Sequence, residues 1–174
     1  MHHMELRPQP AVEQDEVDRL VAAWHVARPE LDPSPLEVLS RVSRLSKHLD
    51  RARQRVLDTQ DLDLWEFDVL TALRRTSAPH ELSPGALLHA TLVTSGTMTN
   101  RIDRLTDRGL VARRPDPQDG RGVLVRLTAQ GQARADAAMT ELLERERDLL
   151  AELDVDQRAM LASLLRRLLL PFDT

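Results

Sequence analysis

Apolar residues recur at intervals of three and four along most of the chain, which is the spacing of one face of an α-helix. Ser34-Pro35 and Asp63 precede two of these stretches, and such residues are favoured where a helix begins. The pattern predicts a mainly α-helical chain, with helices at residues 12–28, 34–58, 64–75, 83–90, 94–108 and 128–152 and one more after Asp154.

Two short segments depart from the helical spacing. Residues 110–114 and 123–127 are strand-like, and the loop between them is rich in Pro, Gly and Asp. They predict a β-hairpin. Gly109 stands just before it and is expected to end the preceding helix in the left-handed conformation. A short helix, a tight turn, a second helix and an immediate hairpin have the order of a winged helix-turn-helix.

The second helix of this unit, residues 94–108, has two distinct faces. Met98, Ile102 and Leu105 share one side and are expected to be buried. The other side is small and polar, and Asn and Arg provide forked donors for bases or phosphates. This side favours contact with DNA, although an ordinary solvated helix face has the same pattern. The predicted DNA-contacting residues of the helix are Ser95, Gly96, Thr97, Thr99, Asn100, Arg101 and Arg104.

Charge is distributed unevenly along the chain. The 174 residues carry 24 Lys and Arg against 28 Asp and Glu, a net charge of −4. Residues 83–127 hold seven Arg and four Asp, a net charge of +3, so the remainder carries −7. The predicted DNA-binding lobe is therefore basic within an acidic chain, which favours double-stranded DNA as a partner.

Several classes of function find no support in the sequence. There is no Cys, so thiol chemistry and Cys-ligated metals are excluded. The histidines have no paired spacing, and we expect no metal site and no cofactor. No nucleophile–base pair or phosphate-binding loop is present, so we expect no catalytic residue and no enzyme. The apolar runs are shorter than the roughly 20 residues of a membrane span, and the expected compartment is the cytoplasm.

The chain resembles the MarR family of bacterial transcription regulators over about residues 36–170. The resemblance rests on Leu64–Leu70, Ser95–Leu105, Arg108–Val111 and Val125–Thr128. It implies an intertwined helical homodimer, in which two winged lobes bind a pseudo-palindromic operator. It also implies that the protein acts as a repressor. The implied division is an N-terminal arm and leader helix at 1–33, a dimerisation helix at 34–60, the winged helix-turn-helix at 61–128 and C-terminal dimerisation helices at 129–174.

The resemblance also assigns the wing. Asp119-Gly120-Arg121 is similar to the Asp-x-Arg of the family's wing. Arg121 would then enter the minor groove, with Asp119 orienting its guanidinium group. Gly120 departs from the basic residue that is frequent there.

A ligand is implied by four further residues. Trp24, Asp68, Arg101 and Arg113 resemble, in order, those of the urate-responsive branch of the family. Asp68 and Arg101 are expected to be partly desolvated, and a plain ion pair between them is the alternative explanation. An anion that captures Arg101 would oppose DNA binding. We therefore expect release by a small anionic or aromatic ligand, urate being one candidate.

Two other functions remain open from the sequence. One is a winged helix that docks on a protein partner, and the other is a DNA-binding regulator that has no small-molecule ligand. The basic lobe argues against the first, because its charge suits the phosphate backbone.

Overall fold

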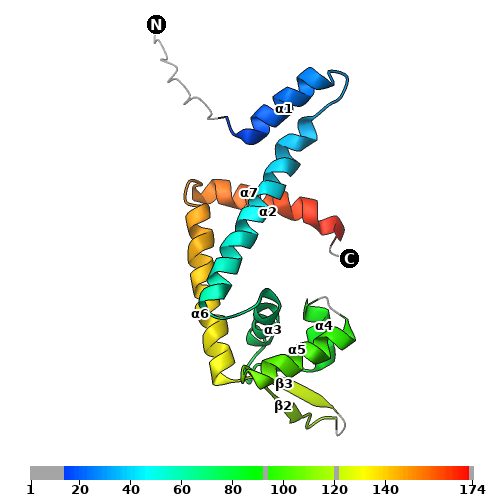
Figure 1. The fold of residues 1–174 in the computed structure, drawn as a ribbon, viewed down its shortest axis with the longest axis vertical. Coiled ribbons are helices and arrows are strands. Elements are labelled where there is room, and N and C mark those ends of the chain that lie inside the picture. Colours follow the sequence, from blue (N-terminus) through cyan, green and yellow to red (C-terminus); the bar gives the residue numbers. More distant parts are fainter. Residues whose placement is uncertain (1–13, 92–93, 120–121, 173–174) are drawn as a thin grey trace. The chain divides into compact units, whose positions relative to one another are not determined.

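The computed structural model describes residues 14–91, 94–119 and 122–172 (Figure 1). It divides into two compact units, Met1–Asp50 and Arg51–Thr174. In the described parts of the chain, no helix is long and apolar enough to cross a membrane. The fold is mostly helical, with one small antiparallel sheet, as the sequence predicts.

The first unit contains α1 (Glu16–Ala27) and the start of α2 (Ser34–Thr59). Asp15 caps α1, accepting hydrogen bonds from Val17 N at 2.7 Å and Asp18 N at 3.0 Å. Arg41 of α2 donates to Asp15 Oδ2 at 2.8 Å and to Asp18 Oδ1 at 2.7 Å, which joins the capped end of α1 to α2. The side-chain cap thus serves both to start one helix and to attach it to the next.

The second unit contains the remaining elements. After the end of α2 come α3 (Leu64–Arg74), β1 (Glu81–Leu82), α4 (Pro84–Thr91) and α5 (Ser95–Asp107). They are followed by β2 (Val111–Pro115), β3 (Val123–Leu127), α6 (Ala129–Leu149), α7 (Val155–Leu169) and a short 3₁₀ turn, η1 (Leu170–Phe172).

The sheet has the strand order β1-β3-β2, and both pairings are antiparallel. Val111 pairs with Leu127 and Pro115 with Val123, so β2 and β3 form the predicted hairpin. The sequence did not predict β1, because a strand of two residues has no periodicity to detect. Its Glu81 pairs with Arg126 of β3.

One apolar core holds the second unit together. Its centre is formed by α3, whose Val69, Leu70 and Leu73 are completely buried. Leu87 of α4 and Leu105 of α5 pack into the same cluster, as do Val125 of β3 and Ala138 of α6. Because α5 and the hairpin share this core, the position of one is tied to that of the other.

Two glycines position the junction between α5, the hairpin and α6. Gly109 has φ +69° just after α5 ends, which confirms the predicted left-handed residue. Gly131 lies in the first turn of α6, and a Cβ there would stand only 2.0 Å from Leu110 O. The start of α6 therefore packs directly on the backbone before β2, an approach that only glycine permits.

Candidate nucleic-acid interface

The elements α4 and α5 are followed directly by the β2–β3 hairpin, the order of a winged helix-turn-helix (Figure 1). On α5, Met98 and Ile102 are each 1% exposed and Leu105 is fully buried, which confirms the predicted inner face. The outer face is polar and accessible. Its exposed residues are Ser95, Gly96, Thr97, Thr99, Asn100 and Arg104, with Arg101 half-buried at the edge.

The first turn of α5 is small and open. Thr94 caps the helix, and its hydroxyl is 2.9 Å from that of Thr97. A Cβ on Gly96 would meet no atom within 4 Å, so nothing in the described chain requires a glycine there. Small side chains at a helix N-terminus allow close approach of a nucleic-acid backbone or groove edge.

Trp65 of α3 lies beside this face. The Cζ atoms of Arg104 and Arg101 stand 4.7 Å and 5.4 Å from the centroid of its ring, within the range of cation–π interaction. The indole Nε1 donates a hydrogen bond of 3.0 Å to Asp63 Oδ2. An open hollow of about 440 Å³ is lined by Trp65, Gly96, Thr97, Asn100, Arg101 and Arg104.

Arg108, at the C-terminal end of α5, has a different role. It donates to the fully buried carboxylate of Glu66 and, through Nη2, to Asp61 Oδ2 at 2.6 Å. Arg134 of α6 reaches the same Asp61 carboxylate at 3.0 Å. This network joins α3, α5 and α6, and it engages Arg108 in holding the lobe together. Neither Glu66 nor Arg108 stood among the predicted site residues, since a helical pattern does not show which charge will be buried.

Ion pairs connect the hairpin to its surroundings. Arg113 Nη2 of β2 lies 2.6 Å from Asp103 Oδ1 on the outer side of α5. Arg114 makes a two-pronged contact with Glu81 of β1, with Nε 2.7 Å from Oε2. Hydrogen bonding from Arg114 lowers the pKa of Glu81 below its usual value. The base of the wing is thereby attached both to α5, the second or recognition helix of the helix-turn-helix, and to the edge strand β1.

The tip of the wing is only partly described. Gly122 N donates to Asp119 O at 2.8 Å, and Asp116 N donates to Gly122 O at 2.9 Å, so these residues close the turn. Asp119 is exposed. Gly120 and Arg121, the second of which is the predicted minor-groove residue, lie outside the described residues.

The four predicted ligand residues belong to two units. Trp24, 43% exposed, belongs to Met1–Asp50, whereas Asp68, Arg101 and Arg113 belong to Arg51–Thr174. Asp68 is exposed, so the expectation that it is partly desolvated was wrong: it projects from the side of α3 that faces away from the core. Among the described residues, Asp68 and Arg101 form no ion pair. The alternative explanation, that these two residues simply pair with each other, is therefore wrong.

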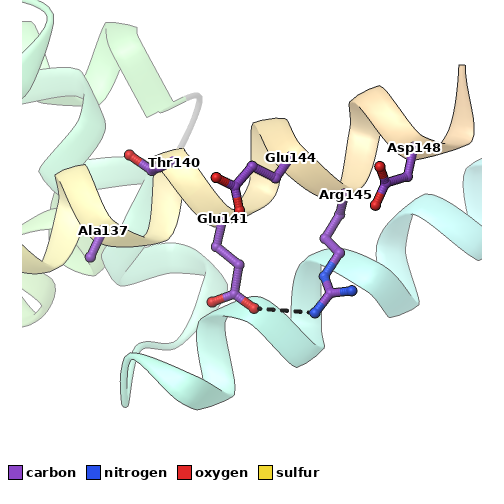
Figure 2. A pocket seen from close by; sticks show the side chains of 6 residues that line it. All are labelled: Ala137, Thr140, Glu141, Glu144, Arg145 and Asp148. Atoms are coloured by element: carbon purple, nitrogen blue, oxygen red, sulfur yellow. Dashed lines mark ion pairs between the residues drawn. The ribbon is translucent and has the colours of Figure 1, made fainter. Parts of the chain in front are cut away.

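The hollow shown in Figure 2 has another character. It has a volume of about 640 Å³ and is lined by six residues of α6. Arg145 pairs with Glu141 at 3.8 Å, and Glu144 and Asp148 add negative charge. Such a surface repels phosphate. Within the described ranges, no cluster of three or more His, Asp or Glu side chains could hold a metal ion.

The fold and the exposed face of α5 define a winged helix-turn-helix protein of the DNA-binding type. Comparison with known proteins agrees, since residues 60–122 match the MarR family. The chain is 37% identical to the HTH-type transcriptional regulator PecS of Dickeya dadantii over 152 residues, which cover 87% of this chain and 92% of PecS. It is 31% identical to the multiple antibiotic resistance protein MarR of Escherichia coli over 130 residues, or 74% and 88% of the two chains. The chain belongs to the MarR family and is a DNA-binding transcriptional regulator of the MarR type.

Solved structures support this assignment. A variant of E. coli MarR in complex with operator DNA matches with a TM-score of 0.62 and 28% identity, over 84% of this chain and 97% of that one. BpsR of Bordetella bronchiseptica, whose DNA binding is regulated by 6-hydroxynicotinic acid, matches with a TM-score of 0.61 and 27% identity, over 75% and 91%.

Proposed function

We propose that this protein is a homodimeric repressor that acts in the cytoplasm and binds a pseudo-palindromic operator through two winged helix-turn-helix lobes. A small anionic ligand releases it from the DNA. The protein acts by binding, without catalysis. The observation that carries the proposal is the exposed face of α5, which combines an open N-terminal turn at Gly96 with the donors of Asn100, Arg101 and Arg104.

The outer face of α5 can contact both the bases and the phosphate backbone of DNA. Asn100 can make two hydrogen bonds to adenine, whereas arginine forks fit guanine or phosphate. The small residues at the start of α5 let the helix approach the groove without a steric barrier. The wing would add Arg121, expected in the minor groove, with Asp119 beside it. The related E. coli MarR, solved with operator DNA, supports this use of the fold.

The proposed dimerisation is supported by the apolar surface that a single chain leaves exposed. Leu164 is 47% exposed and Phe172 is 80% exposed. Exposed apolar patches of this kind mark interaction surfaces. A second copy of the chain is the occupant that a two-fold symmetric operator requires, because each half-site needs its own α5. The apolar residues concerned are Val38, Leu39, Val42 and Leu45 on α2 and Met160, Leu161, Leu164, Leu168 and Leu169 on α7.

The ligand part of the proposal rests on two arginines. Arg101 lies on the recognition helix, and Arg113 is bound to Asp103 of that helix. An anion that engages them would compete with Asp103 and pull on α5, so ligand and DNA would weaken each other's binding. Trp24 and Asp68 would complete the site, contacting a flat ring and a ring nitrogen. The regulation of BpsR by an aromatic acid supports this class of ligand, of which urate is the first to test.

The test is a mobility-shift titration on the intergenic DNA beside the protein's own gene, with and without urate. We expect a shifted complex at moderate salt, footprinting of a palindrome and loss of the complex as urate rises. Absence of any protected palindrome would contradict the DNA-binding proposal and would favour docking on a protein partner. If the protein protects a palindrome but urate and related aromatic acids do not release it, operator binding stands and this class of ligand is excluded.

A further inference from the structure

We propose that Trp65 is a positioning residue for DNA recognition, whose indole ring holds the guanidinium groups of Arg101 and Arg104 on the outer face of α5. The inference rests on the proposed operator binding and adds a residue from outside the helix-turn-helix. Trp65 lies on α3, which precedes α4 and α5 in the chain.

The geometry brings both arginines onto one aromatic ring. Arg104 Cζ is 4.7 Å and Arg101 Cζ is 5.4 Å from the ring centroid. Both distances lie within the roughly 6 Å over which a cation is attracted by the π face. The two arginines are three positions apart on α5, so they lie on adjacent turns of the helix and reach the same neighbour.

The ring itself is held by the N-terminal cap of α3. Its Nε1 donates to Asp63 Oδ2 at 3.0 Å, and the Asp63 backbone N–H donates to Glu66 Oε2 at 2.9 Å. Glu66 is fully buried and binds Arg108, the residue that directly follows α5. The indole is therefore anchored to the same network that fixes α5, which keeps the ring in register with the helix that it supports.

Other arginines at the end of α5 and on β2 are held by carboxylates instead. Arg108 binds Glu66 and Asp61, Arg113 binds Asp103, and Arg114 binds Glu81. Those pairs use the N–H donors that a phosphate or base would need.

A ring face holds a guanidinium group differently, because stacking leaves the donors in the guanidinium plane available. Arg104 also forms an ion pair with Asp63, but the 3.7 Å between Nη2 and Oδ2 is too long for a hydrogen bond. Trp65 thus restrains two cations without occupying their donors.

This restraint lowers the entropy lost on DNA binding. A free arginine on an exposed helix samples many rotamers, and ordering it at an interface opposes association. Stacking on a fixed ring narrows those rotamers before DNA arrives. Loss of the ring should therefore weaken operator binding even though Trp65 itself need not contact the DNA.

The experiment is a double-mutant cycle on the full-length protein with the footprinted operator duplex. Trp65→Leu, Trp65→Phe, Arg104→Lys and the combination of Trp65→Leu with Arg104→Lys are compared by fluorescence anisotropy, and melting curves establish that each variant is folded. We expect Trp65→Leu to weaken binding about three- to tenfold, and Trp65→Phe, which keeps an aromatic face, to lose less. Arg104→Lys should cost clearly less in the Trp65→Leu background than in the wild type.

A spectroscopic readout keeps the inference testable if Trp65→Leu does not fold. The chain has two tryptophans, so Trp24→Phe leaves Trp65 as the single emitter. Operator DNA should change its emission, and Arg104→Ala should change the emission of the free protein, because the cation leaves the ring. Additive costs in the cycle, or an emission unaffected by Arg104→Ala, would overturn the inference. A wild-type protein that binds no operator would instead overturn the proposed function.

Discussion

Arg113 Nη2 lies 2.6 Å from Asp103 Oδ1, which joins the first strand of the hairpin to the outer side of the recognition helix. Both side chains are accessible to solvent, so an incoming anion can reach the arginine. The pair thus holds wing and helix together. In the proposed ligand site, Asp103 would compete with the anion for Arg113, which would link ligand binding to the DNA-binding face.

Asp103→Asn should strengthen binding of the anionic ligand. It removes the carboxylate that competes for Arg113, and since exposed ion pairs contribute about 0.2–1 kcal/mol, the gain in ligand affinity should be up to about fivefold. Calorimetric titration with urate, or with another aromatic acid that releases the wild-type protein from DNA, measures it. Arg113→Ala is the matched variant and should abolish the binding. Ligand affinity unchanged by both substitutions would remove Arg113 from the site.

The two glycines at positions 131 and 96 should respond in opposite ways to alanine. Gly131→Ala places a Cβ 2.0 Å from Leu110 O, and the forced shift should cost about 1–3 kcal/mol in the free energy of unfolding. Gly96→Ala meets open space and should stabilise the helix by up to about 1 kcal/mol. Urea unfolding of the two variants measures both effects.

Gly96→Ala should nevertheless weaken operator binding, because its methyl group projects from the first turn of α5 and keeps the helix farther from the DNA. A Gly131→Ala protein as stable as the wild type would mean that α6 does not approach Leu110 as closely as described. Unchanged operator affinity in Gly96→Ala would show that this turn stays clear of the DNA.

A charge on the exposed apolar face of α7 should dissociate the proposed dimer. Leu164→Arg or Leu168→Arg would place a guanidinium group in an apolar interface and weaken self-association by at least about tenfold. Light scattering after size-exclusion chromatography gives the mass. Val155→Arg lies about 180° around the helix from Leu164 and about 140° from Leu168, and serves as the control that should stay dimeric. A monomeric wild type would contradict the proposed assembly.

Asp15 should titrate far below an ordinary aspartate. Hydrogen bonding from Arg41 lowers its pKa from 3.8 to about 2. Because the folded state lowers this pKa, the pair contributes stability above pH 3.8, and that contribution is lost as the pH falls from 3.8 to about 2. NMR titration of the Asp15 carboxyl carbon should show the low midpoint. Arg41→Ala should return it toward the ordinary value, and a midpoint indifferent to Arg41 would contradict the contact.

The buried face of α5, the end of that helix and the hairpin could be predicted from the sequence because they depend on local patterns. The burial of Met98, Ile102 and Leu105 follows from the 100° advance of a helix, and the role of Gly109 follows from helix termination. The hairpin was predictable because its loop combines Pro, Gly and Asp between two β-type runs.

Other features depend on contacts between distant segments. Asp68 has apolar neighbours in sequence, yet on the helix they point to other sides, and its carboxylate is exposed. The burial of Glu66 under Arg108 and the stacking of two arginines on Trp65 depend on side-chain contacts between distant segments, which no local pattern contains. The close approach of Gly131 to Leu110 is of the same kind.

The most direct measurement is the dissociation constant for the footprinted operator and for a random duplex of the same length, over a range of salt concentrations. It compares the wild type with Asn100→Ala, Thr97→Ala and Arg121→Ala. We expect Asn100→Ala or Thr97→Ala to change sequence preference, whereas Arg121→Ala should weaken binding to both duplexes and reduce the salt dependence. Equal affinity of the wild type for the two duplexes, or equal losses on both for all three variants, would contradict sequence-specific recognition by α5.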